Sequence, residues 1–187
     1  MVKKKTCIFI SGQGSNLKNI ISHSRDKIFP ITVNLIITND KNANGIIHAK
    51  KYNIPYVYIN TNRTDCENEI ILNLKKHKIT FICLAGYMKI ISSKIINLFR
   101  KKIINIHPSL LPKFKGLNTF SRVIKDNEKK TGCTVHYVNN KLDDGNTIIK
   151  KSFDISSYDN EKTLKQKTQM LEYRAYPEAI IKIFRYI

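Results

Sequence analysis

The chain has 187 residues, the usual length of one domain with a full hydrophobic core. Its formal net charge is +19, and 27 of its 33 basic residues are lysines that occur in every predicted element. Because isoleucine (31) and asparagine (19), which share AT-rich codons with lysine, are also abundant, we interpret the charge as a genome-wide composition bias. We therefore expect no nucleic-acid partner, although the positive field favours anionic substrates.

The apolar runs and the cysteines limit the class of protein further. No apolar run reaches about 18 residues, so we expect no membrane span. The four cysteines lack Cys-x-x-Cys spacing, and three of them lie in apolar, strand-like runs. We predict buried free thiols in a reducing cytoplasm, rather than disulfides or zinc ligands, for Cys7, Cys66, Cys83 and Cys133.

Strands and helices alternate over the first 106 residues. We predict strands at 5–10, 31–38, 55–59, 79–85 and 103–106, and helices at 17–23, 46–52, 64–74 and 92–99. This alternation is typical of βαβ units in a mostly parallel sheet, which binds its ligands at the carboxyl ends of the strands. Segments 11–15, 86–89 and 105–107 lie at that edge.

The second half of the chain has a different pattern. Residues 132–139 and 147–152 indicate antiparallel strands, and residues 161–184 indicate a long helix that Pro177 should kink or interrupt. The predicted fold is α/β: a Rossmann-like, mostly parallel sheet flanked by helices, with antiparallel strands in the C-terminal half and a long C-terminal helix. No linker or composition shift divides the chain, so we predict a single domain over residues 1–187.

A glycine-rich loop, Gly12–Asn16, follows the first strand and opens a helix. Backbone N–H groups and the positive end of the helix bind anions in this geometry. The loop is not a dinucleotide fingerprint, because Leu17 occupies the third glycine position, and it lacks the Gly-Lys-Ser/Thr of a Walker loop. Two interpretations remain: a cradle for one phosphate group, or a tight turn with a serine cap.

The strand at 103–106 presents Asn105 and His107 two residues apart, so their side chains share one face. An amide donor beside a group that titrates near neutrality is typical of an active site. A positioned imidazole also needs a carboxylate, and Asp143 in the turn before Gly145 is the best candidate. The alternatives are a core histidine with satisfied hydrogen bonds and an aspartate that only forms a turn.

Residues 105–119 resemble the signature of the folate-dependent formyltransferases, and Leu142–Gly145 resembles its partner motif. Residues 10–17, 84–90 and 169–177 are similar to further motifs of the family, in the same order. The resemblance extends over about residues 5–180. It is most specific for the branch of the family that formylates phosphoribosylglycinamide.

The resemblance implies transfer of the formyl group of 10-formyltetrahydrofolate to the amine of 5'-phosphoribosylglycinamide, the third step of de novo purine biosynthesis. Asn105 would donate to the oxyanion. His107, as an imidazolium, would stabilise the oxyanion and pass a proton to the leaving nitrogen, and Asp143 would raise the pKa of His107 and order water. The resemblance implies no metal and no covalent intermediate.

The resemblance also implies which residues bind the two substrates. The residues matching the ribonucleotide site are Gly14, Ser15, Asn16, Gln169 and Glu172. The residues matching the folate site are Arg63, Met88, Lys89, Ile90, Ile91, Asn105, Asn139, Asn140, Lys141, Leu142 and Asp143. By halves, we expect residues 1–100 to carry phosphate and nucleotide binding and residues 101–187 to carry catalysis and folate binding. The exceptions are Arg63 and Met88–Ile91 of the folate site in the first half, and Gln169 and Glu172 of the ribonucleotide site in the second.

Several polar positions need separate interpretation. The family usually has His, Arg and His where this chain has Asn118, Lys89 and Tyr173. Asn118 keeps a donor but loses a titratable group. In the layout of the family His136 lies toward the site, whereas we interpret the remaining histidines as surface or helix-end residues: His23, His48 and His77.

Three alternative functions remain at this point. A formyltetrahydrofolate hydrolase needs a regulatory domain before residue 1, and a methionyl-tRNA formyltransferase needs a C-terminal RNA-binding domain; we expect neither. The third is a non-catalytic, basic nucleic-acid binder. We expect a cytoplasmic monomer or homodimer that acts on small molecules, without a membrane or nucleic-acid partner.

Overall fold

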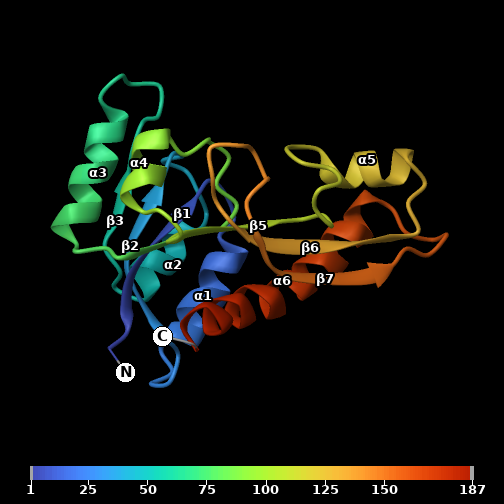
Figure 1. Cartoon of the computed structure of the whole chain (residues 1–187), viewed down its shortest axis with the longest axis horizontal. Helices are drawn as coiled ribbons and strands as arrows, with labels where there is room; N and C mark the ends of the chain where they lie inside the picture. Colours follow the sequence, from blue (N-terminus) through green and yellow to red (C-terminus); the bar gives the residue numbers. More distant parts are fainter. Residues whose placement is uncertain (1, 186–187) are drawn as a thin grey trace. The chain divides into compact units, whose positions relative to one another are not determined.

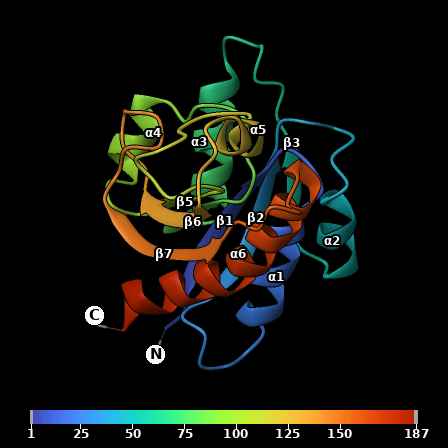
Figure 2. The same ribbon diagram turned by 90° about the vertical axis from the view of Figure 1, so that its right-hand side faces the viewer.

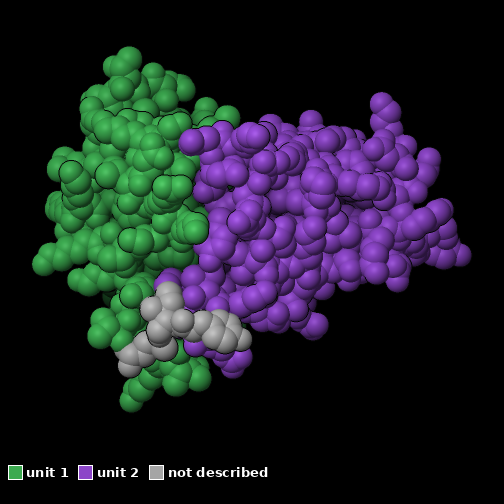
Figure 3. Space-filling view, in the orientation of Figure 1, with its two compact units in different colours: residues 1–104 green, residues 105–187 purple. Residues whose placement is uncertain are grey.

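The computed structural model describes residues 2–185. The chain divides into two compact units, residues 1–104 (unit 1) and residues 105–187 (unit 2), which Figure 3 shows in different colours. Seven strands form one sheet with the order β3-β2-β1-β4-β5-β6-β7. This is the predicted mixed α/β fold, with parallel strands first and an antiparallel pair at the end.

Unit 1 alternates strands and helices, as Figure 1 shows. Its elements are β1 (Lys4–Ile10), α1 (Ser15–Ser24), β2 (Ile31–Thr38), α2 (Ile46–Lys51), β3 (Tyr56–Tyr58), α3 (Cys66–Lys76), β4 (Phe81–Leu84) and α4 (Ser93–Leu98). β1 pairs in parallel with β2 and β4, and β2 pairs in parallel with β3. These strands and helices confirm the predicted ones to within a few residues.

The core of unit 1 is formed by continuous apolar strands. The last five residues of β1 and all four of β4 are buried, as expected for central parallel strands covered on both faces. Cys7 and Cys83 belong to this core, and Cys133 is buried in unit 2, which confirms the prediction of buried free thiols for these three. Cys66 is free but only half-buried.

Unit 2 begins within β5 (Ile103–His107) and continues with α5 (Thr119–Lys125), β6 (Lys130–Tyr137), β7 (Thr147–Asp154) and α6 (Glu161–Phe184). β6 and β7 pair antiparallel, as predicted. α6 packs along both strands, which can be followed in Figure 1 and Figure 2. The sequence did not predict α5, a short helix whose N-cap residue, Asn118, has a left-handed backbone.

The long C-terminal helix predicted over residues 161–184 is confirmed, whereas an interruption at Pro177, one of the two expected effects of this proline, is wrong. α6 is one helix that begins at a capping box formed by Asn160 and Thr163 and continues through Pro177. Pro177 cannot donate a backbone hydrogen bond, but Tyr176, Pro177 and Ile180 are all buried. Because packing supplies most of the stability of a helix in a protein, this buried face outweighs the lost hydrogen bond.

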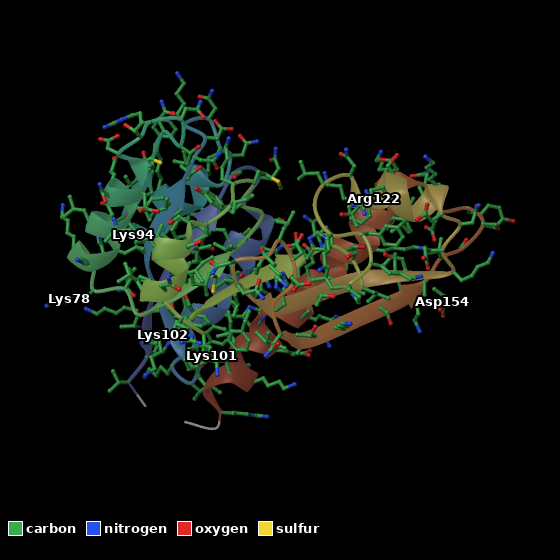
Figure 4. All side chains as sticks on the ribbon, turned by 45° about the horizontal axis from the view of Figure 1, so that its top comes forward. Lys78, Lys94, Lys101, Lys102, Arg122 and Asp154 are labelled. Carbon is green, nitrogen blue, oxygen red and sulfur yellow. The ribbon has the colours of Figure 1, made fainter. Side chains whose placement is uncertain are left out.

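The lysines are distributed as the sequence predicts. Lys78, Lys94 and Lys101, labelled in Figure 4, are exposed and come from three different segments of unit 1. None of the helices among residues 2–185 has the length and apolar character to cross a membrane.

Candidate active site

Asn105, His107 and Asp143 meet in unit 2. The Nδ1 atom of His107 lies 3.2 Å from Oδ2 of Asp143, and the Asn105 amide donates to Oδ1 of Asp143 at 3.3 Å. Both side chains from β5 thus reach one carboxylate, as their spacing on an extended strand requires. The side chains of His107 and Asp143 are each only 7% exposed. The structure therefore brings together the three residues that the sequence selected.

The turn that carries Asp143 depends on a glycine. A Cβ atom on Gly145 would lie 1.6 Å from the carbonyl oxygen of Tyr137, so no side chain fits there. Asp143 itself has a left-handed backbone, with φ of 48°, and its Oδ2 accepts a hydrogen bond from the N–H of Gly116 at 2.9 Å. The position of the Asp143 carboxylate is thus fixed by the backbone of its own turn and by the N–H of Gly116.

His136 is a fourth member of the cluster. Its Nδ1 lies 2.9 Å from the carbonyl oxygen of Tyr137, so Nδ1 carries the donating proton. Its Nε2 then presents a lone pair to the Asn105 amide at 3.3 Å, and it lies 3.6 Å from Oδ1 of Asp143. Only the family resemblance pointed to His136. The signal available in the sequence itself was a histidine near the end of the predicted strand 132–139.

Both ring nitrogens of His107 face an acceptor. Nε2 donates to the carbonyl oxygen of Phe114 at 2.8 Å, while Nδ1 faces Asp143. Phe114 has a left-handed backbone, with φ of 57°, which directs its carbonyl. Neutral His107 therefore holds its proton on Nε2, and Nδ1 is the atom that gains a proton when the ring becomes charged.

Burial decides the charge of His107. Burial lowers the pKa of His107, and the hydrogen bond to Phe114 and the charge of Asp143 raise it by less, so the net pKa lies below the ordinary value of 6.5. Asp143 does raise the pKa of His107, as we expected, but this effect is too small to make the imidazolium the favoured form of the ring. Burial would raise the pKa of Asp143, but its contact with His136 and the hydrogen bond from the N–H of Gly116 outweigh this and lower it. The site at neutral pH thus pairs a neutral imidazole with a carboxylate.

The lowered pKa of His107 predicts a pH-dependent stability. Between that lowered value and 6.5 the unfolded chain binds more protons than the folded one, so stability rises with pH. The contribution is complete above 6.5 and is lost as the pH falls through the folded pKa. Urea denaturation between pH 7.5 and 5 is expected to show a smaller loss of stability for His107→Gln than for the parent chain. Equal pH dependence in the two proteins would contradict this.

The glycine loop lies in unit 1 and depends on a contact between two glycines. Gly14, with φ of 73°, is the N-cap residue of α1 and makes no side-chain capping bond. A Cβ atom on Gly14 would lie 2.5 Å from Cα of Gly45, whose N–H donates to the carbonyl oxygen of Gly12. The N-cap residue is therefore glycine, not the serine of the alternative interpretation. The N-cap residue therefore places no side chain of its own over the positive end of α1, the end of a helix that favours anions.

Gly14→Ala is expected to destabilise the protein by about 2–3 kcal/mol, because the new methyl group meets the backbone of Gly45 and a positive φ is strained for alanine. The matched control is Gly12→Ala, because a Cβ atom on Gly12 meets nothing within 4 Å. Urea denaturation of both variants measures the difference. Equal stability of the two variants would contradict the prediction, because it would show that the backbones of Gly14 and Gly45 can move apart at no cost.

The proposed folate segment of unit 1 follows β4. Met88 and Ile90 are 62% and 83% exposed, whereas Ile91 is buried in the core. The N–H of Met88 donates to Oγ of Ser11 at 2.8 Å, so this segment is hydrogen-bonded to the residue before the glycine loop. Lys89 is exposed. Two exposed apolar side chains on a held backbone form a suitable wall for a flat, partly apolar ligand.

The remaining candidate residues lie in three places. Arg63 precedes α3 and forms ion pairs with Asp65 and Glu69, so a ligand would have to compete with these carboxylates. Gln169 and Glu172 lie three residues apart on α6, which places them on the same face of this helix. The turn before Asp143 is exposed and consists of Asn139, Asn140, Lys141 and Leu142.

Comparison with known proteins gives consistent matches. Residues 4–180 match the formyl transferase family. The chain is 37% identical over 185 residues to the phosphoribosylglycinamide formyltransferase of Haemophilus influenzae, covering 97% of this chain and 87% of that protein. It is also 37% identical to the trifunctional purine biosynthetic protein adenosine-3 of Drosophila pseudoobscura pseudoobscura. That match covers 95% of this chain but only 14% of the longer protein.

Solved structures agree with these sequence matches. The crystal structure of phosphoribosylglycinamide formyltransferase from Bacillus halodurans has a TM-score of 0.92 at 35% identity. The match covers 96% of this chain and 95% of that one. The chain therefore belongs to the formyl transferase family.

Proposed function

We propose that the protein transfers the formyl group of 10-formyltetrahydrofolate to the amine of 5'-phosphoribosylglycinamide, giving formylglycinamide ribonucleotide and tetrahydrofolate. The observation that carries the proposal is the meeting of the half-buried Asn105 with the buried side chains of His107 and Asp143. The relatives and solved structures that bear the name of this enzyme match the chain over almost its whole length and support the proposal.

In the proposed reaction the amine nitrogen attacks the formyl carbon, and the carbonyl oxygen becomes a tetrahedral oxyanion. The bond from that carbon to N10 of the folate then breaks. Asn105 donates to the oxyanion through its amide. Its two present hydrogen bonds are both long, at 3.3 Å, so one is readily exchanged for a charged acceptor. One such donor contributes about 3 kcal/mol to stabilising the transition state.

The proposed reaction also moves one proton from the attacking amine to N10. Neutral His107 beside ionised Asp143 is suited to hold this proton at Nδ1, because the carboxylate 3.2 Å away stabilises the imidazolium that results. A direct hydrogen bond from Nε2 of His107 to the oxyanion would have to replace the Phe114 carbonyl. Asp143 thus acts as the partner that makes a buried charge on His107 tolerable.

The substrate-binding residues are part of the same proposal. Gly14, Ser15 and Asn16 at the start of α1 bind the phosphate of the ribonucleotide, and Gln169 and Glu172 bind near its ribose. The folate lies against Arg63, Met88–Ile91 and Asn139–Asp143. We propose one formyltransferase domain that acts in the cytoplasm as a monomer or homodimer and uses no metal.

The test mixes purified protein with glycinamide ribonucleotide and 10-formyl-5,8-dideazafolate and follows the absorbance change of deformylation, with His107→Ala as a control. We expect a signal that requires the ribonucleotide and is lost in the control. Folate turnover without the ribonucleotide would indicate a hydrolase. A folded but inactive protein that is retained on RNA in a salt-dependent way would indicate the nucleic-acid binder.

A further inference from the structure

In the loop between β5 and α5, the main-chain groups of residues 114–117 point alternately toward the cluster of Asn105, His107 and Asp143 and toward an arginine side chain. The carbonyl of Phe114 accepts from His107 and the N–H of Gly116 donates to Asp143, so these two groups face the cluster. The carbonyls of Lys115 and Leu117 instead accept from one guanidinium. The Phe114 carbonyl and the Gly116 N–H, which face the cluster, are thus each followed in the chain by a carbonyl that accepts from this guanidinium.

That guanidinium belongs to Arg122, labelled in Figure 4, on α5. Its Nη1 donates to Lys115 O at 2.6 Å and to Leu117 O at 3.3 Å. Its Cζ also lies 5.5 Å from the centre of the Phe114 ring, within the range of a cation–π contact. One exposed side chain therefore contacts three of the four residues from Phe114 to Leu117.

We propose that Arg122 is a positioning residue that holds the segment 114–117, so that the Phe114 carbonyl stays on His107 and the Gly116 N–H stays on Asp143. The role goes beyond the residues already assigned to the reaction, since Arg122 itself contacts neither His107 nor Asp143 by a hydrogen bond. Its importance for turnover depends on the proposed function, but its effect on His107 does not.

Two effects of Arg122 on the pKa of His107 have opposite signs, which makes the proposal testable. The ionisable groups whose charge acts on the pKa of His107 are Asp143, which raises it, and Arg122 and the protonated form of His136, which lower it. The charge of Arg122 lowers the pKa of His107, and the hydrogen bond to Phe114, which Arg122 helps to hold, raises it by more. Loss of the charge alone would raise the pKa of His107, whereas release of the loop lowers it.

The experiment is an NMR titration of the His107 ring in the full chain, for the parent, Arg122→Gln and Arg122→Lys. Lysine keeps the charge but cannot form the planar, forked contact with two carbonyls and a ring. We expect the pKa of His107 to fall in both variants. We also expect kcat for formyl transfer to fall about 5-fold with little change in KM. A fall of about 5-fold corresponds to the net free energy of one ordinary hydrogen bond.

Lys125→Gln is the matched control, because it removes one exposed positive charge from the same helix. A raised pKa of His107 in Arg122→Gln, with no change in Arg122→Lys, would overturn the proposal by showing that Arg122 acts only through its charge. An unchanged pKa in both variants would overturn it as well. Circular dichroism checks that each variant is folded. If the parent chain fails to transfer formyl groups, only the proposed function fails, because the titration is independent of turnover.

Discussion

Asp143→Asn is expected to lower kcat/KM for formyl transfer by about 10³-fold, the usual scale for loss of a group that assists proton transfer. Asparagine has the same shape, tolerates the positive φ of this position and keeps an oxygen for the N–H of Gly116. The substitution therefore removes the charge and preserves the turn. Without the carboxylate, burial opposes a charge on His107 with no compensation from Asp143, and the proton held at Nδ1 loses its partner.

The measurement is the absorbance assay under steady-state conditions, with Asp144→Asn as the control. Asp144 is the next residue in the chain, but it is exposed and pairs with Lys115 at the surface. Surface ion pairs contribute little, so we expect the control to retain activity within about 3-fold. Full activity in Asp143→Asn would contradict the assignment of this carboxylate to proton transfer.

Asn105→Ala is expected to lower kcat by about 10²- to 10³-fold with a smaller change in KM, because the amide acts on a charge that exists only in the transition state. The substitution also removes the group that donates to Asp143 and faces Nε2 of His136. Some loss of stability is therefore expected together with the loss of activity.

Steady-state kinetics at saturating folate, with a urea denaturation of the same protein, separates the two effects. Asn97→Ala is a suitable control, since Asn97 is exposed on α4. A variant at Asn105 that raises KM but leaves kcat unchanged would assign the amide to substrate binding and would contradict its role toward the oxyanion.

Much of the fold was predictable because its signals are local. The strands of unit 1 have continuous apolar runs, and the turns between them are rich in glycine and asparagine, so element type and order follow from periodicity. α5 was not predicted because residues 119–125 have mixed polarity and no side-chain cap at Asn118. The helix over residues 161–184 was predicted, but the sequence could not decide whether Pro177 would interrupt it, because its continuity depends on burial against β6 and β7, which no local pattern reports.

The candidate site likewise has parts that could be predicted from local sequence signals and parts that could not. Asn105 and His107 were selected from their spacing on one strand, and Asp143 from the need of an imidazole for a carboxylate. The Phe114 carbonyl and the Gly116 N–H could not be selected, because every residue has a carbonyl and almost every residue has an N–H. The lowered pKa of His107 also could not be read from the sequence, since its largest cause is burial.

The use of main-chain atoms has a consequence for a chain with so strong a composition bias. Substitution toward lysine, asparagine and isoleucine changes side chains, but it leaves the carbonyl of residue 114, the N–H of residue 116 and the N–H groups that open α1 in place. Purifying selection then needs to preserve only a few side chains and the glycines that shape the turns. A site of this construction tolerates mutational drift across most of its surroundings.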